Sequence, residues 1–428
     1  MDKLKQPAVT FFVAGLMLFG FMQLLIPMPV PMHYVFIITS MLLIVTSTGE
    51  GVTVNYACVM FLTALVVSIL GNKIPVFFKP WQRFALFFMM FVGCSPMLSG
   101  PAICRVRRQM TMGAHYAMLL VAVLSFVGYF AGFGKRLTGI VDSYMGITSH
   151  PNFLGFFTMV SMVFVASLFF RCTKMWERVV YISLWVTCLI TLLLASSRSA
   201  LALALVGTII EVYLRYQKNA TAMINTVVVL VCAVILSLPL LIPYMESMMK
   251  KNMDFDDSES VLADTRGSIW ELRYQEIDES PIIGVGAYSC DITLENADIF
   301  YDDVAGNIEQ GSSYLGITAQ TGYFGLIAFL LIALPIIWKV IRYAFRERTP
   351  YAQMWLPVIL VIAGNMIFEG YLITAGAVQC IVLWLTLGAA DQCDKVADYP
   401  VFWEKWPPIT PEQYEHWREN IAEDGDKR

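Results

Sequence analysis

The sequence predicts an all-α, polytopic membrane protein of about twelve transmembrane helices with one large extracytoplasmic loop. Three observations support this fold class. The chain of 428 residues is 57% hydrophobic and only 14% charged, its mean hydropathy is clearly positive, and its apolar runs have the length that a bilayer requires. Soluble domains of this size do not have such a composition.

Breaks between the apolar runs place the expected helices. The first run follows MDKLKQP, as in a secretory signal, but has no small-residue cleavage site, so it is expected to remain as a helix. The domains are nine helices in 1–244, an extracytoplasmic loop in 245–312, three helices in 313–390 and a polar cytoplasmic tail in 391–428. The twelve helices are expected at about 8–26, 32–47, 52–70, 82–98, 112–133, 152–170, 179–195, 199–214, 221–244, 313–338, 352–368 and 371–390.

The lysines and arginines of the short loops predict the orientation. Cytoplasmic loops carry an excess of these residues. With the amino terminus inside, the short outside connections carry only Lys73, Lys79, Arg83, Lys135, Arg136 and Arg198. The inside loops carry Lys3, Lys5, Arg105, Arg107, Arg108, Arg171, Lys174, Arg178, Arg215, Lys218, Lys339, Arg342, Arg346 and Arg348. Both termini are therefore expected in the cytoplasm, and loop 245–312 outside.

This outer loop is strongly acidic and contains one helical pattern. Its Asp and Glu residues far outnumber its lysines and arginines. The stretch DTRGSIWELRYQEIDESP starts with a capping Asp, ends at a proline, and has apolar residues on one side: Ile269, Trp270, Tyr274 and Ile277. It predicts a short amphipathic helix that lies on the membrane domain. The following PIIGVGAYS is a glycine-hinged turn and no phosphate loop, because neither a lysine nor a helix start follows it.

The cysteine pattern excludes several kinds of chemistry. Nine cysteines are scattered singly without a CxxC pair, which indicates neither a disulfide framework nor a zinc site. No cofactor, metal or nucleic acid is expected to bind.

Arg198 stands alone in an apolar tract. From Val179 to Ile210 no other residue is charged, and this tract is barely long enough for two spans of roughly 20 residues. Arg198 therefore lies in a tight turn close to lipid, where an ionisable group is costly and points to function. It also begins a helix, whose free N–H groups and dipole favour an anion. The alternative is that it extends to lipid headgroups.

A second arginine could complete an anion site. Arg266 lies at the predicted start of the loop helix, and two guanidinium groups near a membrane surface suit a lipid-linked phosphate or pyrophosphate. Alternatively, Arg266 pairs with an acidic neighbour.

Three carboxylate or imidazole groups are candidates for the general base. Glu309 precedes the tenth span, in NIEQGSSYLGITAQTGYFGL, where partial desolvation would raise its proton affinity. Glu369 lies in a tight turn between two spans and could instead pair with an arginine. His150 in SHPNFLGFF could be a helix cap. Asn152, Gln310 and Tyr314, in the same two stretches, are candidate substrate-binding residues.

These stretches resemble the superfamily of O-antigen polymerases and O-antigen ligases, which are bacterial membrane glycosyltransferases of a GT-C-like fold. The resemblance lies in HPNFLGFF, SSRSALALAL, TRGSIWELRYQEIDESPIIGVGAYS and SSYLGITAQTGYFGLIAFL, in this order, between residue 150 and about 340. It implies an active site on the outer face of the bacterial inner membrane. It also implies that Arg198 and Arg266 bind the pyrophosphate of a polyprenyl-linked glycan.

The resemblance has one departure. Ligases carry a histidine and an asparagine where this chain has Gly311 and Ser312, and a glutamate where it has Gln320. This favours a repeat-unit polymerase that is inverting and metal-independent, with a lipid-linked glycan as acceptor. Such an enzyme could work beside a flippase and a chain-length regulator. The alternatives are a ligase that transfers glycan to a lipid or protein, and a transporter or flippase of lipid-linked glycan.

Overall fold

A computed structural model describes residues 30–47, 52–72, 74, 79–137, 143–170, 172, 174–217, 219–221, 223–226, 228, 265–291, 301–302, 307–308, 310–374 and 376–394. These residues are mostly helical, in agreement with the predicted fold class. Within them, five helices have the length and apolar composition of a membrane span, so the chain is a multi-pass membrane protein: Ala102–Ala131, Pro151–Phe169, Met175–Leu194, Arg198–Tyr216 and Ser313–Glu347. The expected span at 8–26 and most of that at 221–244 lie outside the described residues.

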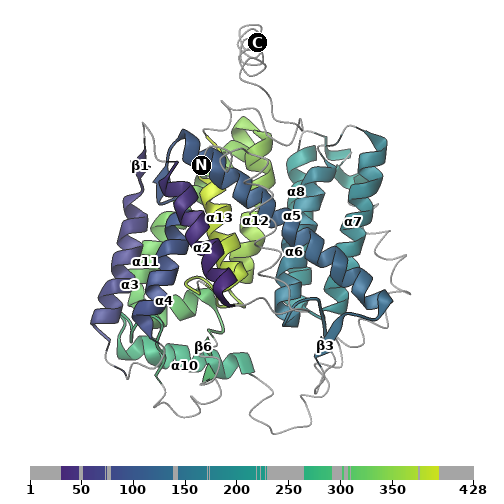
Figure 1. Ribbon diagram of the computed structural model, residues 1–428. Coiled ribbons are helices and arrows are strands. Elements are labelled where there is room, and N and C mark those ends of the chain that lie inside the picture. Colours follow the sequence, from purple (N-terminus) through teal and green to yellow (C-terminus); the bar gives the residue numbers. More distant parts are fainter. Residues whose placement is uncertain are drawn as a thin grey trace, which may run out of the picture.

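The helices stand side by side, and one short helix, α10, crosses an end of the bundle (Figure 1). In the described parts of the connections, short antiparallel strands form three pairs, namely β1 with β2, β3 with β4 and β5 with β6. The helices are α2 (Val30–Val45), α3 (Tyr56–Leu70), α4 (Pro80–Cys94), α5 (Pro101–Ala131), α6 (Pro151–Phe169), α7 (Met175–Leu194), α8 (Arg198–Tyr216), α10 (Thr265–Glu279), α11 (Ser313–Arg342), the π-helical turn η3 (Tyr343–Glu347), α12 (Pro350–Asn365) and α13 (Val378–Ala390). The strands are β1 (Thr53–Val54), β2 (Leu98–Ser99), β3 (Lys135–Leu137), β4 (Ser143–Gly146), β5 (Tyr301–Asp302) and β6 (Asn307–Ile308).

Helix α6 is the central helix of one side of the bundle. It packs against α5, α7, α8 and α12, and nearly all of its residues are buried. Gly207 allows α8 to approach α6 and α12 closely. A Cβ at this position would lie 2.6 Å from a methyl of Val163 in α6 and 2.7 Å from a methyl of Val361 in α12. Small residues commonly permit such contacts in membranes, where close packing stabilises helix pairs.

Two of the described helices begin more than four residues from their predicted starts. Helix α5 begins at Pro101 and not at 112, so Arg105, Arg107 and Arg108 lie within it and not in a loop. Arg107 is fully buried and donates from Nη2 to the carbonyl of Leu98 at 2.9 Å. The last helix begins at Val378 and not at 371. The apolar residues before it form turns instead, and these turns belong to the candidate site.

Helix α11 is interrupted at Gly322, and the turn after α10 fills the break. Gly322 has a φ of 65° and a ψ of −174°, which is not helical. Residues 281–286 pair with the interrupted backbone: Val285 N–H donates to Ala319, Gly286 N–H to Gln320, and Tyr323 N–H to the carbonyl of Pro281. Backbone groups at membrane depth must be satisfied by protein, so the glycine-hinged turn supplies the bonds that the helix loses.

Helix α10 occupies Thr265–Glu279, where the sequence predicts a short helix. Its buried face differs from the prediction, because Tyr274 is 53% exposed whereas Arg273 and Glu276 are fully buried. These two side chains form an ion pair, and Glu276 Oε1 also accepts from the Asp291 N–H at 2.8 Å. Opposite charges three residues apart in a helix were the available sequence signal, but the apolar pattern alone did not place this pair inside.

Substitution of Glu276 is expected to loosen the outer loop. Glu276→Gln should lower the unfolding free energy by about 2 kcal/mol, because the buried guanidinium of Arg273 would lose the carboxylate with which it forms an ion pair. The measurement is the thermal unfolding midpoint of the purified protein in detergent. Glu279→Gln, an exposed position of the same helix, is the matched control. Equal midpoints for the two variants would contradict a stabilising role of the ion pair.

Candidate functional site

Arg198 is the first residue of α8 and is exposed at one end of the bundle. The turn that joins α7 to α8 is tight, and Ser196 in it has a φ of 53°. The first turn of α6 lies directly against it, because a Cβ at Gly155 would be 2.8 Å from Ser197 Cβ. The starts of α6 and α8 therefore share one end, and the amino-terminal N–H groups of both helices point to it.

His150 is the N-cap of α6. Its Nδ1 accepts a hydrogen bond from the backbone N–H of Asn152 at 3.2 Å, and Pro151 takes the first helical position. Because Nδ1 acts as an acceptor, the neutral imidazole carries its proton on Nε2. A group that must abstract a proton needs a vacant lone pair, so His150 fits a cap and hydrogen-bond donor better than a general base. Asn152 is half-buried in the same turn.

The cap predicts a distinctive mutational pattern. His150→Asn should keep transfer activity and stability close to wild type, since Asn is among the best N-cap residues. His150→Ala should lower the unfolding free energy by about 1 kcal/mol through loss of the cap. Transfer rates and thermal unfolding of both variants check this. A large loss of rate in a well-folded His150→Asn would instead assign chemistry to the imidazole.

Glu369 lies at the same end as Arg198. Helices α8 and α12 are antiparallel, since a Cβ at Gly364 would meet Leu203 at 2.5 Å while Gly207 meets Val361. Arg198 is the first residue of α8, five residues before Leu203, and Glu369 lies in the turn just after α12, five residues after Gly364. The register therefore places both ends at one height.

The turn between α12 and α13 is fixed to the start of α11. The Ser313 Oγ donates to the Glu369 carbonyl at 2.7 Å, and the Tyr371 N–H donates back to that Oγ at 3.0 Å. The ring of Tyr371 packs against Phe156 in the first turns of α6, with centroids 5.4 Å apart. The half-buried Glu369 is thus held by its backbone between α6 and α11. Nothing in the sequence singled out Ser313 for this role.

Gln310 is held at the same end by Gln320. Gln320 is fully buried, donates from Nε2 to Gln310 Oε1 at 3.0 Å, and accepts the Tyr288 N–H at 2.9 Å. A Cβ at Gly370 would lie 1.9 Å from Gln310 Cβ, so only glycine fits beside it. Gln320, which stands where the ligases have a glutamate, therefore holds the side chain of Gln310.

The side chain of Tyr314, the third predicted binding residue, lies between helices α11 and α12. Its hydroxyl donates to the Ala363 carbonyl at 3.0 Å. The side chain lines an apolar cavity of about 70 Å³ among α11, α12 and α13, with Phe329 and Met366 as neighbours. The structure thus places Tyr314 between helices and not beside Gln310.

Helix α10 brings the second predicted arginine to this end. Trp270, one turn after Arg266, donates from Nε1 to the Gly311 carbonyl at 3.3 Å. Arg266 belongs to the first turn of α10, but its side chain and all of Glu309 lie outside the described residues.

Burial raises the pKa of the Cys290 thiol in the outer loop to about 11, so this cysteine stays protonated and unreactive.

The candidates Arg198, His150, Asn152, Gln310 and Glu369 thus lie at one end of the bundle. Helix α10 crosses an end of the bundle (Figure 1) and contacts the segment just before α11 through Trp270. Among the described residues, no group of three or more His, Cys, Asp or Glu could hold a metal ion.

Three comparisons with known proteins give different outcomes. No curated protein matches the sequence. A chain from the solved structure described as "Structural coordination of polymerization and crosslinking by a peptidoglycan synthase complex" is similar with a TM-score of 0.40 and 12% identity, over 80% of this chain and 98% of that chain. Residues 183–330 match the family model Wzy_C, described as O-antigen ligase. This range includes Arg198, α10 and the start of α11, and the chain therefore carries a domain of the O-antigen ligase and polymerase family.

Proposed function

We propose that the protein polymerises lipid-linked oligosaccharide repeat units into a surface polysaccharide. In this reaction a glycan moves from its polyprenyl pyrophosphate onto a second lipid-linked repeat unit. The observation that carries the proposal is the position of Arg198, which begins α8 at the end of the bundle where Gln310, Glu369 and α10 meet. The family match adds that the substrates are lipid-linked glycans.

The proposed chemistry is a single displacement. A hydroxyl oxygen of the acceptor attacks the anomeric carbon of the donor, and the bond from that carbon to the pyrophosphate oxygen breaks, which inverts the configuration. Arg198 and Arg266 stabilise the negative charge that develops on the departing pyrophosphate, because fixed donors contribute most where charge appears in the transition state. The exposed start of α8 adds its own N–H groups. No metal is needed for this step.

The acceptor proton passes to a general base at this end of the bundle. Glu309 is the first candidate, since it directly precedes the Gln310 that Gln320 holds. Glu369 is the second, because its backbone is fixed to Ser313 at the same end. His150 is the third, and its cap bond argues against it.

Transfer of glycan to a different lipid or a protein is the second candidate function. The description of the matched family as O-antigen ligase favours it. Against it stands the absence of the ligase histidine, because the corresponding residues are Gly311 and Ser312. A transporter of lipid-linked glycan would be expected to place polar groups near the midplane of the membrane, whereas the candidate residues here gather at one end.

One reconstitution separates these functions. Purified protein in detergent receives polyprenyl-pyrophosphate repeat units without nucleotide or added metal. A ladder of products supports the polymerase. Single addition, seen only when a different acceptor lipid or protein is supplied, supports a ligase. If no product forms and the protein instead moves the lipid-linked glycan across the bilayer of proteoliposomes, the protein is a transporter and neither transferase function holds.

The proposed orientation places the site outside the cytoplasm of a bacterial inner membrane, with both termini inside. A reporter fused after Lys251 should therefore appear outside, and one fused after Arg348 inside, because the positive charges of the short loops favour this arrangement. Alkaline phosphatase and fluorescent protein fusions measure it. A cytoplasmic reporter after Lys251 would place the anion site on the wrong face and exclude the proposed donor.

A further inference from the structure

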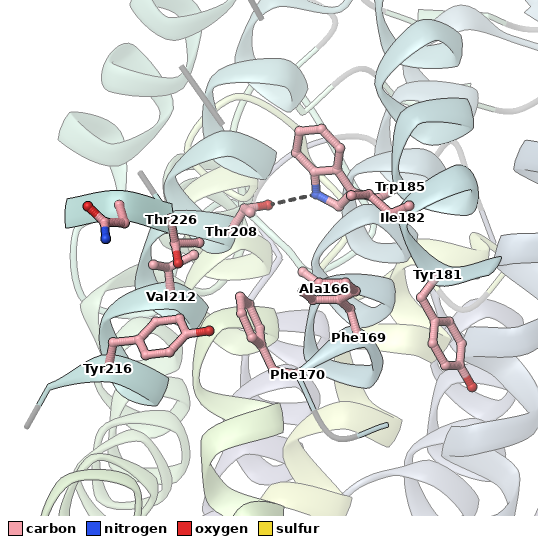
Figure 2. A pocket seen from close by; sticks show the side chains of 11 residues that line it. Ala166, Phe169, Phe170, Tyr181, Ile182, Trp185, Thr208, Val212, Tyr216 and Thr226 are labelled. Atoms are coloured by element: carbon pink, nitrogen blue, oxygen red, sulfur yellow. Dashed lines mark hydrogen bonds between the residues drawn. The ribbon is translucent and has the colours of Figure 1, made fainter. Parts of the chain in front are cut away.

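An apolar cavity lies between α6, α7 and α8, at the end of these helices opposite to Arg198. Its volume is about 290 Å³. Figure 2 shows the rings of Phe170, Tyr216 and Trp185 around it, with Ile182 and Val212 on facing helices. Helices α7 and α8 are joined by a three-residue turn but share few contacts, so they diverge from that turn and leave this space.

The lining indicates a hydrocarbon ligand. Besides the two tyrosines, the polar residues of the lining are Trp185, Thr208, Asn225 and Thr226. The polar groups of Trp185 and Thr208 are paired, because Trp185 Nε1 donates to Thr208 Oγ1 at 3.3 Å (Figure 2) and that hydroxyl donates to the Ala204 carbonyl at 2.9 Å. Water therefore gains little by entering beside these two side chains. An apolar cavity of about 150 Å³ stays dry and takes up benzene, and this one is roughly twice as large.

The cavity is a lateral pocket of the lipid-facing surface. Ile182, which lines it, is 50% exposed, and its neighbours Val179 and Val186 are 55% and 44% exposed. Such a flank of a membrane helix faces hydrocarbon. The ring of Phe170 contacts the ring of Tyr216 with centroids 5.9 Å apart. Both rings line the pocket where α6 and α8 end.

The rim of the pocket has the features of a headgroup region. Tyr181 and Tyr216 line it, and tyrosine is enriched at membrane interfaces. Exposed cations flank both: Arg178 lies three residues before Tyr181, and Arg215 directly precedes Tyr216. Because α7 and α8 are antiparallel and joined by a short turn, Arg178 near the start of α7 and Arg215 near the end of α8 lie at the same end of the bundle. Juxtamembrane lysine and arginine attract anionic lipids.

We propose that this pocket binds an anionic phospholipid of the leaflet opposite to Arg198. One acyl chain fills the space between Phe170, Trp185 and Val212, and the phosphate contacts Arg178 and Arg215. The observed charge at the rim selects this occupant over the isoprenoid chain of the donor, whose phosphates would be held at the other end of α8. The site is therefore separate from the proposed transferase site and does not depend on it.

Native mass spectrometry of the purified full chain tests the proposal. The probes are dioleoylphosphatidylglycerol, dioleoylphosphatidylcholine and polyprenyl phosphate, each titrated in detergent. One phosphatidylglycerol should be retained in preference to phosphatidylcholine. Ala166→Phe, which fills the pocket, should abolish this retention, whereas Ile209→Phe, at a 54% exposed position of α8 that does not line the pocket, should not.

A second variant keeps the test decisive if Ala166→Phe folds poorly. Arg178→Gln combined with Arg215→Gln changes only exposed side chains and should weaken phosphatidylglycerol binding roughly thirtyfold. The effect on phosphatidylcholine should be smaller, because its choline cation offsets the charge of the phosphate. Equal retention of the two phospholipids would overturn the proposal. Preferential retention of polyprenyl phosphate that is sensitive to Ala166→Phe would also overturn it and assign the pocket to the donor lipid.

Discussion

Arg198→Lys is expected to lower the rate of glycan transfer about a hundredfold while the protein folds normally. Lysine keeps the charge but offers a point charge in place of a planar fork, so it cannot bind two oxygens of the leaving pyrophosphate in parallel. Loss of one such contact to a developing charge costs roughly 3 kcal/mol, which corresponds to the expected change in rate. Single-turnover rates with a polyprenyl-pyrophosphate donor measure it.

The control is Arg342→Lys, an exposed arginine in the last turn of α11, which should have no effect on the rate. Arg266→Ala is expected to lower the rate as Arg198→Lys does. A normal rate in Arg198→Ala, with unchanged thermal unfolding, would reduce Arg198 to a residue that extends to lipid headgroups, and the proposed donor site would have to be sought elsewhere.

Glu309→Gln is expected to slow transfer by roughly a hundred- to ten-thousandfold, the range for loss of a general base. Donor binding should be retained, because glutamine is nearly isosteric and the arginines hold the pyrophosphate. The rate in the wild type should rise with pH as the carboxylate loses its proton, and this acidic limb of the profile should disappear in the variant. Single-turnover rates between acidic and neutral pH, together with donor affinity, give both quantities.

Glu369→Gln and Glu279→Gln complete this experiment. Glu279 is exposed on α10 and should tolerate the change. If Glu309→Gln keeps a normal rate and profile while Glu369→Gln loses both, the base is the residue in the turn after α12. If all of these variants are active, including His150→Asn, stabilisation of the leaving group by the arginines would carry the reaction, and no single side chain would act as the base.

The sequence alone predicted the features that depend on local pattern. Apolar runs predicted a helical membrane protein, and the isolated charge of Arg198 in a tract without room for a loop predicted a helix start near lipid. The capping signal of DTRGSIWEL predicted a helix, which α10 occupies. Proline after His150 predicted the start of α6. Each of these depends on neighbours within about one turn, and such interactions are nearly the same in any fold.

Only the tertiary structure decided the features that depend on distant partners. Arg107 lies buried in α5, where the carbonyl of Leu98 accepts from it. Gly322 interrupts α11, and residues 281–286 supply hydrogen bonds to the interrupted backbone. Helix α13 starts late, after a turn that Ser313 and Phe156 hold. Hydropathy shows which segments are apolar, but it does not show which distant residue hydrogen-bonds to a given backbone or charged group. At membrane depth, a helix can begin, break or end only where such a partner satisfies its backbone groups.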